Sequence, residues 1–263
     1  MEEECIGVLH SGSAGDILYS LLYLKKLSER YNKKINIFIN NFSHYSQGSG
    51  YYELLKDLIA AQPYINKVEC AGEYPLTHVV YLTTAFICAQ KKLHVNLDNV
   101  RINFEPFNTP YPIQYFNIKG FQDENNTWTF PVEENWYQPW MEVPVDPRDI
   151  NENRFSLVNR SMRYRKNNAC VEAKIKQLQE SHDVYFVGTD EEYDDMNKIV
   201  KLERIITKDY AELAQYISRA DNVIVNPTCG LAIAQAIGCN NIILEVPDQR
   251  IGGMNFGNIK ELL

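Results

Sequence analysis

The hydrophobic and polar positions of the chain follow two periods, one typical of buried strands and one typical of amphipathic helices. In the first half, short apolar runs predict strands at residues 5–10, 35–39 and 78–82. Apolar residues at helical spacing predict helices at residues 16–27 and 51–62. Strands that alternate with helices favour a parallel sheet.

The second half repeats this alternation more regularly. Helices are predicted at residues 170–181 and 191–201, and the sequence Asp209-Tyr-Ala-Glu212 resembles the capping box that begins a helix. A helix of small residues is expected after the polar turn at residues 226–230. Strands are predicted at residues 155–159, 184–187, 205–206, 222–225 and 242–246. This order predicts a second doubly wound α/β unit.

A less regular segment separates the two halves. Residues 101–154 concentrate prolines and tryptophans, which is typical of a partly ordered excursion followed by a linker. We therefore predict an N-terminal domain of residues 1–148 and a C-terminal domain of residues 149–263. The predicted fold class is α/β, with two Rossmann-like doubly wound domains that face each other across a cleft.

Composition narrows the classes of function. The 263 residues carry 26 Lys and Arg against 34 Asp and Glu, a net charge of −8, so no general basic field indicates a nucleic-acid partner. The six cysteines include no Cys-x-x-Cys pair and no His lies at metal-finger spacing, which argues against a bound metal. The N-terminus is acidic and no apolar run reaches about 18 residues, which predicts a cytoplasmic protein without a membrane span.

The first candidate site is the turn between the first strand and the first helix, which contains Gly12, Ser13, Gly15 and Asp16. Glycine lets the backbone turn sharply and approach a ligand closely. The Asp16 carboxylate could accept a proton from a hydroxyl nucleophile. The alternative is that Asp16 only caps the helix, a common role for Asp at this position.

The second candidate site is the segment that follows the first strand of the second half. It carries four cations in a net acidic protein: Arg160, Arg163, Arg165 and Lys166. Guanidinium groups form bidentate contacts with phosphate, so the segment suits a diphosphate. The alternative is a solvated basic loop, but its place at the carboxyl end of a predicted strand favours phosphate.

The third candidate site is the turn at residues 226–230. The backbone N–H groups of Thr228, Cys229 and Gly230 lie at a predicted helix start, where they can bind an anion. Glu245 comes at the end of the next apolar run, where an acidic residue suits the vicinal hydroxyls of a ribose. The alternative for Glu245 is a polar strand end.

Together these segments resemble the GT-B glycosyltransferases, specifically the group related to the lipopolysaccharide heptosyltransferases (glycosyltransferase family 9). The similarity rests on four segments, which are Gly15-Asp16 and residues 159–165, 184–192 and 211–230. It covers nearly all of the C-terminal unit, but little of the N-terminal unit beyond residues 5–27.

The resemblance implies transfer of a sugar from a nucleotide diphosphate sugar to a hydroxyl acceptor, with inversion and without a required metal. It implies no cofactor other than the donor substrate. By the same resemblance, Asp16 is the general base, and the basic loop and the turn at residues 228–230 stabilise the diphosphate. Glu245 would hold the ribose.

Two other functions fit the same residues. A nucleotide-sugar epimerase would bind the donor and convert it without an acceptor. A catalytically inactive nucleotide-binding module of the same fold would bind the donor without turnover. The family's Asp-Thr-Gly donor turn is replaced here by Pro227-Thr-Cys-Gly230, which removes one acidic group.

Overall fold

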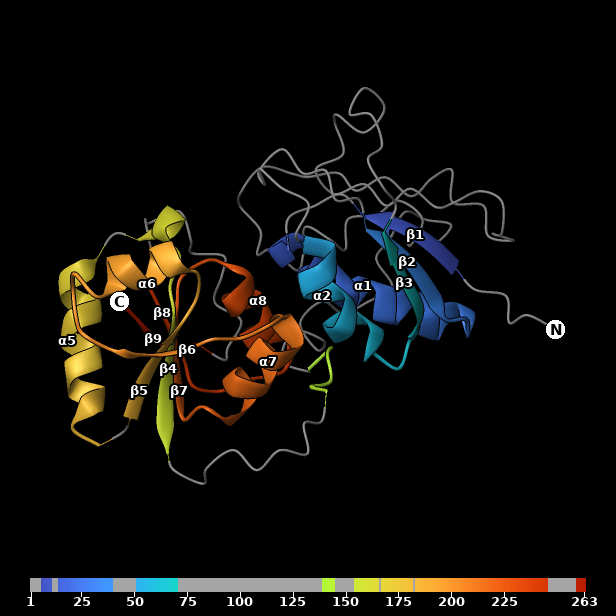
Figure 1. Ribbon diagram of the computed structural model, residues 1–263. Helices are drawn as coiled ribbons and strands as arrows, with labels where there is room; N and C mark the ends of the chain where they lie inside the picture. Colours follow the sequence, from blue (N-terminus) through green and yellow to red (C-terminus); the bar gives the residue numbers. More distant parts are fainter. Residues whose placement is uncertain are drawn as a thin grey trace. The chain divides into compact units, whose positions relative to one another are not determined.

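The computed structural model describes residues 6–10, 14–39, 51–70, 139–144, 154–165, 167–181, 183–245 and 259–263. The chain divides into two compact units, Met1–Glu142 and Val143–Leu263. Each unit is a mixed α/β structure with a parallel sheet, which confirms the predicted fold class at this level (Figure 1). The predicted domain boundary at residue 148 and the strand predicted at residues 78–82 lie outside the described residues and stay predictions.

The first unit contains a parallel sheet with the strand order β1 (Ile6–His10), β2 (Ile35–Ile39) and β3 (Ile65–Cys70). Helix α1 (Ala14–Tyr31) follows β1, and α2 (Tyr51–Ala60) precedes β3. Residues at helical spacing on α1 and alternate residues of β2 are buried, among them Ile17, Leu21, Leu24, Ile35, Ile37 and Ile39. The four elements predicted before residue 63 are therefore confirmed, with α2 ending earlier than expected.

A short segment at residues 139–142 packs against the helices of this unit. Trp140 is buried, and its indole Nε1 donates to the carbonyl of Leu18 on α1 at 3.2 Å. Gln62, just after α2, both donates to the carbonyl of Glu142 at 3.0 Å and accepts from its N–H at 2.8 Å. The last described part of the proline-rich region is thus anchored to the core of the first unit.

The second unit is a six-stranded parallel sheet with the strand order β6-β5-β4-β7-β8-β9. Its strands are β4 (Phe155–Asn159), β5 (Asp183–Val187), β6 (Glu203–Ile205), β7 (Asn222–Val225), β8 (Ile242–Leu244) and β9 (Ile259–Leu262). Its helices are the short η4 (Met162–Tyr164), α5 (Asn168–Gln179), α6 (Asp190–Met196), α7 (Tyr210–Arg219) and α8 (Cys229–Ala236). Numbered along the chain, this is the 3-2-1-4-5-6 order of a doubly wound nucleotide-binding sheet.

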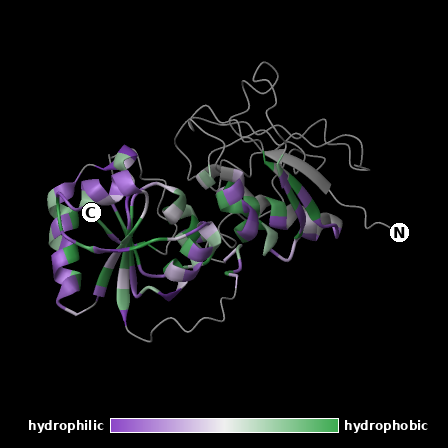
Figure 2. Ribbon diagram, viewed as in Figure 1, coloured by the Kyte–Doolittle hydropathy of each residue, from purple (hydrophilic) through white to green (hydrophobic). Residues whose placement is uncertain are grey.

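Helices cover both faces of this sheet. In Figure 1, α5 and α6 lie on one side of the strands and α7 and α8 on the other. Successive residues of a strand point to opposite faces of the sheet. On one face, Val158, Phe186 and Ile224 pack with Val171 and Ile175 of α5 in one core cluster. Figure 2 shows the apolar residues on the strands and the polar residues on the outer faces of α5 and α6.

Several elements of the second unit differ in detail from those predicted. Helix α6 ends at Met196 rather than at residue 201. A complete capping box occurs at Thr189 and Glu192, whereas at α7 the Asp209 side chain caps the helix but Glu212 accepts from the N–H of Lys208. Residues Ile259–Leu262 form the strand β9, which is not among the predicted strands because its alternating pattern spans only four residues.

Candidate functional site

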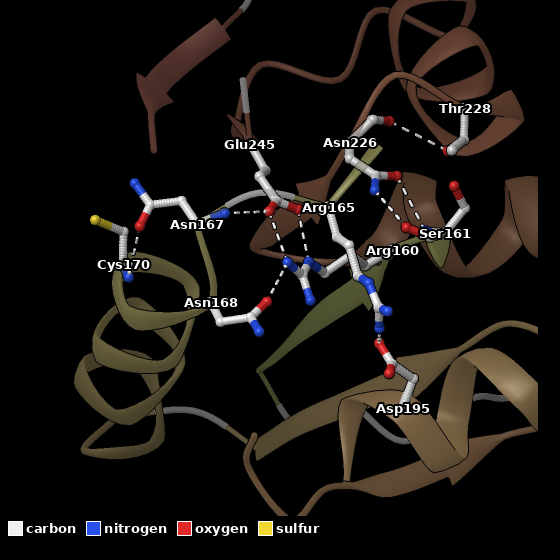
Figure 3. A network of polar contacts seen from close by, with 10 residues as sticks. All are labelled: Arg160, Ser161, Arg165, Asn167, Asn168, Cys170, Asp195, Asn226, Thr228 and Glu245. Atoms are coloured by element: carbon white, nitrogen blue, oxygen red, sulfur yellow. Dashed lines mark hydrogen bonds and ion pairs between the residues drawn. The ribbon is translucent and has the colours of Figure 1, made fainter. Parts of the chain in front are cut away.

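The sheet of the second unit has one topological switch point, between the adjacent strands β4 and β7. From β4 the chain continues toward β5 and β6, and from β7 it continues toward β8 and β9 on the other side. Open α/β sheets bind ligands at the carboxyl ends of the strands at such a point. The predicted basic loop directly follows β4, and the predicted turn directly follows β7. The structure therefore brings the second and third candidate sites together (Figure 3).

Asn226 joins these two segments. Its side chain is completely buried, and its Oδ1 accepts from the N–H of Ser161 at 3.0 Å while its Nδ2 donates to the Ser161 carbonyl at 2.7 Å. Both polar ends of the amide are thus bonded to a single residue of the loop after β4. The sequence places Asn226 in the turn but gives no signal for this contact, because the partner is 65 residues away.

Asn159, the last residue of β4, packs beneath the start of α8. Its Nδ2 donates to the carbonyl of Val187 at the end of β5, at 2.9 Å. A Cβ added to Gly230 would lie 2.0 Å from Oδ1 of Asn159 and 2.8 Å from its Cγ. Glycine is therefore required at position 230 by the close approach of helix and strand, in addition to any contact that its N–H makes with an anion.

We expect Gly230→Ala to lower the free energy of unfolding by about 1–3 kcal/mol, because the new methyl group would overlap a side chain that is held by its own hydrogen bond. At a helix position without this neighbour the same change stabilises by about 1 kcal/mol. Urea denaturation of Gly230→Ala, Asn159→Ala and the double variant measures the coupling between them. Additive losses would contradict the proposed overlap.

Arg160 and Glu245 form a buried ion pair. Nε of Arg160 lies 2.6 Å from Oε2 of Glu245, and Nη2 donates to Oε1 at 2.7 Å, with exposed side-chain fractions of 3% and 0%. Nη2 also donates to Asn168 at 2.8 Å, and the N–H of Asn167 donates to Oε1 of Glu245 at 3.1 Å. The residues predicted to bind phosphate and ribose thus bind each other, and together they fix the start of α5 (Figure 3).

The other basic residues of the loop lie nearer the surface. Arg165 forms an ion pair with Asp195 of α6 and its side chain is 38% exposed. This contact with Arg165 lowers the pKa of Asp195 below its ordinary value, against the opposing effect of partial burial. The guanidinium of Arg163 lies 4.9 Å from the ring centroid of Tyr164. Lys166 lies outside the described residues.

The start of α8 is not capped by the side chain of its N-cap residue. Thr228 is the N-cap residue but makes no side-chain cap hydrogen bond, because its hydroxyl donates instead to the carbonyl of Asn226 at 3.2 Å. Burial of its thiol raises the pKa of Cys229 above the ordinary value. The first backbone N–H groups of a helix are placed where they can bind an anion.

The first candidate site is described only in its backbone. Strand β1 ends at His10 and α1 begins at Ala14, so Gly15 and Asp16 lie in the first turn of α1, at the carboxyl end of β1. Gly12, Ser13 and the side chain of Asp16 lie outside the described residues. The predicted strand and helix are thus confirmed, whereas the turn between them and the role of Asp16 stay predictions.

Within the described residues, no group of three or more His, Cys, Asp or Glu side chains could hold a metal ion. No helix among the described parts of the chain is both long and apolar enough to cross a membrane.

Comparison of the sequence with protein-family models and with curated proteins gives no match. Solved structures do match the fold. A family 9 glycosyl transferase from Veillonella parvula DSM 2008 has a TM-score of 0.64 at 12% identity, over 100% of this chain and 87% of that one. E. coli heptosyltransferase WaaC with ADP has a TM-score of 0.56 at 9% identity, over 97% and 92%.

The same E. coli enzyme with ADP-2-deoxy-2-fluoro heptose gives a TM-score of 0.53 at 9% identity, over 91% of this chain and 87% of that one. The matches extend over most of both chains, so the likeness is not confined to one nucleotide-binding sheet. At these identities the likeness concerns the fold. The chain has the mixed α/β fold, with parallel sheets, of the family 9 glycosyltransferases and heptosyltransferases that it matches.

Proposed function

We propose that this protein is a glycosyltransferase that moves a sugar from a nucleotide diphosphate sugar to a hydroxyl acceptor. The observation that carries the proposal is the switch point of the second unit, where a basic loop and an uncapped helix start are held side by side. The fold of the protein supports it, because the matched structures are glycosyltransferases and two of them contain ADP or an ADP sugar analogue.

The proposed reaction needs positive charge at the leaving group. The acceptor oxygen forms a bond to the anomeric carbon while the bond from that carbon to the diphosphate oxygen breaks, and the electron pair stays on the diphosphate. Fixed guanidinium groups and N–H dipoles stabilise the charge that develops there. In this proposal Arg163, Arg165 and Lys166, with the N–H groups of residues 228–230, perform this task without a metal ion.

Asp16 would accept the proton that the acceptor hydroxyl loses. Direct displacement by the acceptor inverts the configuration at the anomeric carbon, so the proposed outcome is inversion. Glu245 would contact the ribose only by sharing oxygens that already accept from Arg160 and Asn167. For this reason the diphosphate contacts carry more of the proposal than the ribose contact does.

Product analysis tests the proposal directly. The protein is incubated with ADP, GDP, UDP and CDP sugars, with and without added sugar acceptors, and the mixtures are analysed by mass spectrometry and phosphorus NMR. A transferase moves the sugar to water slowly or to an acceptor faster, and in both cases it releases the nucleoside diphosphate. Isomerised nucleotide sugar without release of diphosphate would instead establish an epimerase.

A further inference from the structure

We propose that Asn226 is a positioning residue that holds the basic loop after β4 in register with the turn before α8. The expected effect of Asn226 on nucleotide binding rests on the proposed function, whereas its contact with the loop does not depend on that function. The loop supplies the cationic side chains of the proposed diphosphate site, and the turn supplies the N–H groups. The side chain of Asn226, in the turn, hydrogen-bonds Ser161 of the loop through both ends of its amide.

The amide of Asn226 continues the pairing of two strands beyond their ends. The backbones of β4 and β7 are paired as far as Asn159 and Val225. Pro227 follows Asn226 and has no N–H, so the main chain of the turn cannot extend the ladder. The side chain of Asn226 takes its place by bonding both the N–H and the carbonyl of Ser161 (Figure 3).

The loop depends on such anchors because it has no core of its own. None of the three residues of η4 is buried. The backbone of this segment is anchored on either side of η4, by Arg160 and Ser161 before it and by the Arg165–Asp195 ion pair after it. Of these anchors, the hydrogen bonds between Ser161 and Asn226 are the ones that fix the loop relative to the turn before α8.

Asn222 offers a matched control at the other end of the same strand. It is the first residue of β7 and is buried, like Asn226. Its Nδ2 donates to Oγ of Ser156 on β4 at 3.1 Å, and its Oδ1 accepts from Lys260 at 3.3 Å. Replacement of either asparagine by alanine removes two side-chain hydrogen bonds, at the start of β7 for Asn222 and just after its end for Asn226. Only Asn226 lies at the carboxyl end, beside the proposed site.

The experiment measures two quantities on the wild type, Asn226→Ala and Asn222→Ala. Amide hydrogen exchange reports on the N–H of Ser161, and calorimetric titration reports the affinity for ADP, GDP, UDP and CDP. Asn226→Ala should speed exchange at Ser161 and weaken nucleotide affinity, each by roughly tenfold, the effect of about one lost hydrogen bond. Asn222→Ala should leave both quantities close to the wild-type values, at a similar loss of thermal stability.

The outcomes separate this proposal from the proposed function. Unchanged exchange at Ser161 in Asn226→Ala, or an equal loss of affinity in Asn222→Ala, overturns the positioning role. If the wild type binds no nucleotide, the proposed function fails, and the exchange of Ser161 still decides whether Asn226 holds the loop. Should Asn226→Ala not fold, the wild type alone decides: a Ser161 amide that exchanges as fast as the exposed residues of η4 contradicts the proposal.

Discussion

Glu245→Ala is expected to lower the free energy of unfolding by about 3–5 kcal/mol, because it leaves the Arg160 guanidinium buried without its counter-ion. The loss also removes the acceptor of the Asn167 N–H and so releases the start of α5. Urea denaturation followed by circular dichroism measures the change. Nucleotide affinity should fall with it, because Arg160 begins the basic loop.

Two comparisons identify the cause of this loss. Glu172→Ala breaks the surface pair of Glu172 with Lys176 on α5 and should change stability by less than about 1 kcal/mol. Replacement of both members of the buried pair, as Arg160→Met with Glu245→Leu, should recover most of the stability, since no unpaired charge then remains. A double variant as unstable as Glu245→Ala would show that the buried charge is not the cause.

Asp16→Asn should lower the rate of glycosyl transfer by about 100-fold to 10,000-fold, the usual contribution of a general base. Donor affinity should stay unchanged, because the amide keeps the shape of the carboxylate and the proposed donor contacts lie in the second unit. Steady-state assays of nucleoside diphosphate release, with calorimetric titration of the donor, separate the two effects.

The competing interpretation is that Asp16, in the first turn of α1, only stabilises the helix start; it makes a different prediction, and Glu53 provides its control. Glu53 lies in the first turn of α2 in the same unit, so Glu53→Gln removes a similar helix-start charge at a residue that has no proposed role in the reaction. If Asp16 is only a cap, both variants lose a few tenths to about 1 kcal/mol of stability and neither loses turnover. That result would remove the general base from the proposal.

The sequence predicts the elements of this fold where apolar runs are continuous. Strand β4 is buried at all five positions and β7 at all four. Both are identified by their apolar residues, although β4 also buries Ser156 and Asn159 and β7 also buries Asn222. Edge strands such as β3 and β9 carry polar residues at many positions because one side faces solvent. They are recognised only from their pairing with a neighbouring strand.

The candidate site is predicted in its parts but not in its contacts. The basic loop and the turn are visible as local motifs, and the strand order that unites them follows from a doubly wound topology. The pairing of Arg160 with Glu245 joins residues 85 positions apart. Asp195 belongs to the site because it forms an ion pair with Arg165. Such pairs depend on tertiary geometry, which no local spacing encodes.

The most direct test of the central claim is the affinity of the second unit's switch point for nucleoside diphosphates. Calorimetric titration of ADP, GDP, UDP and CDP is performed on the wild type, Arg163→Ala, Arg165→Ala and the control Arg154→Ala. Arg154 carries the same charge just before β4, at the opposite end of the strand, where it pairs with Asp221.

We predict that the wild type binds at least one of the four nucleotides. That nucleotide should bind more weakly to Arg163→Ala and Arg165→Ala and with unchanged affinity to Arg154→Ala. Bound at about 100 times its dissociation constant, it should also stabilise the protein by about 2.7 kcal/mol. Absence of binding by all four, or equal affinity in all variants, would contradict the assignment of this site to a nucleotide diphosphate donor.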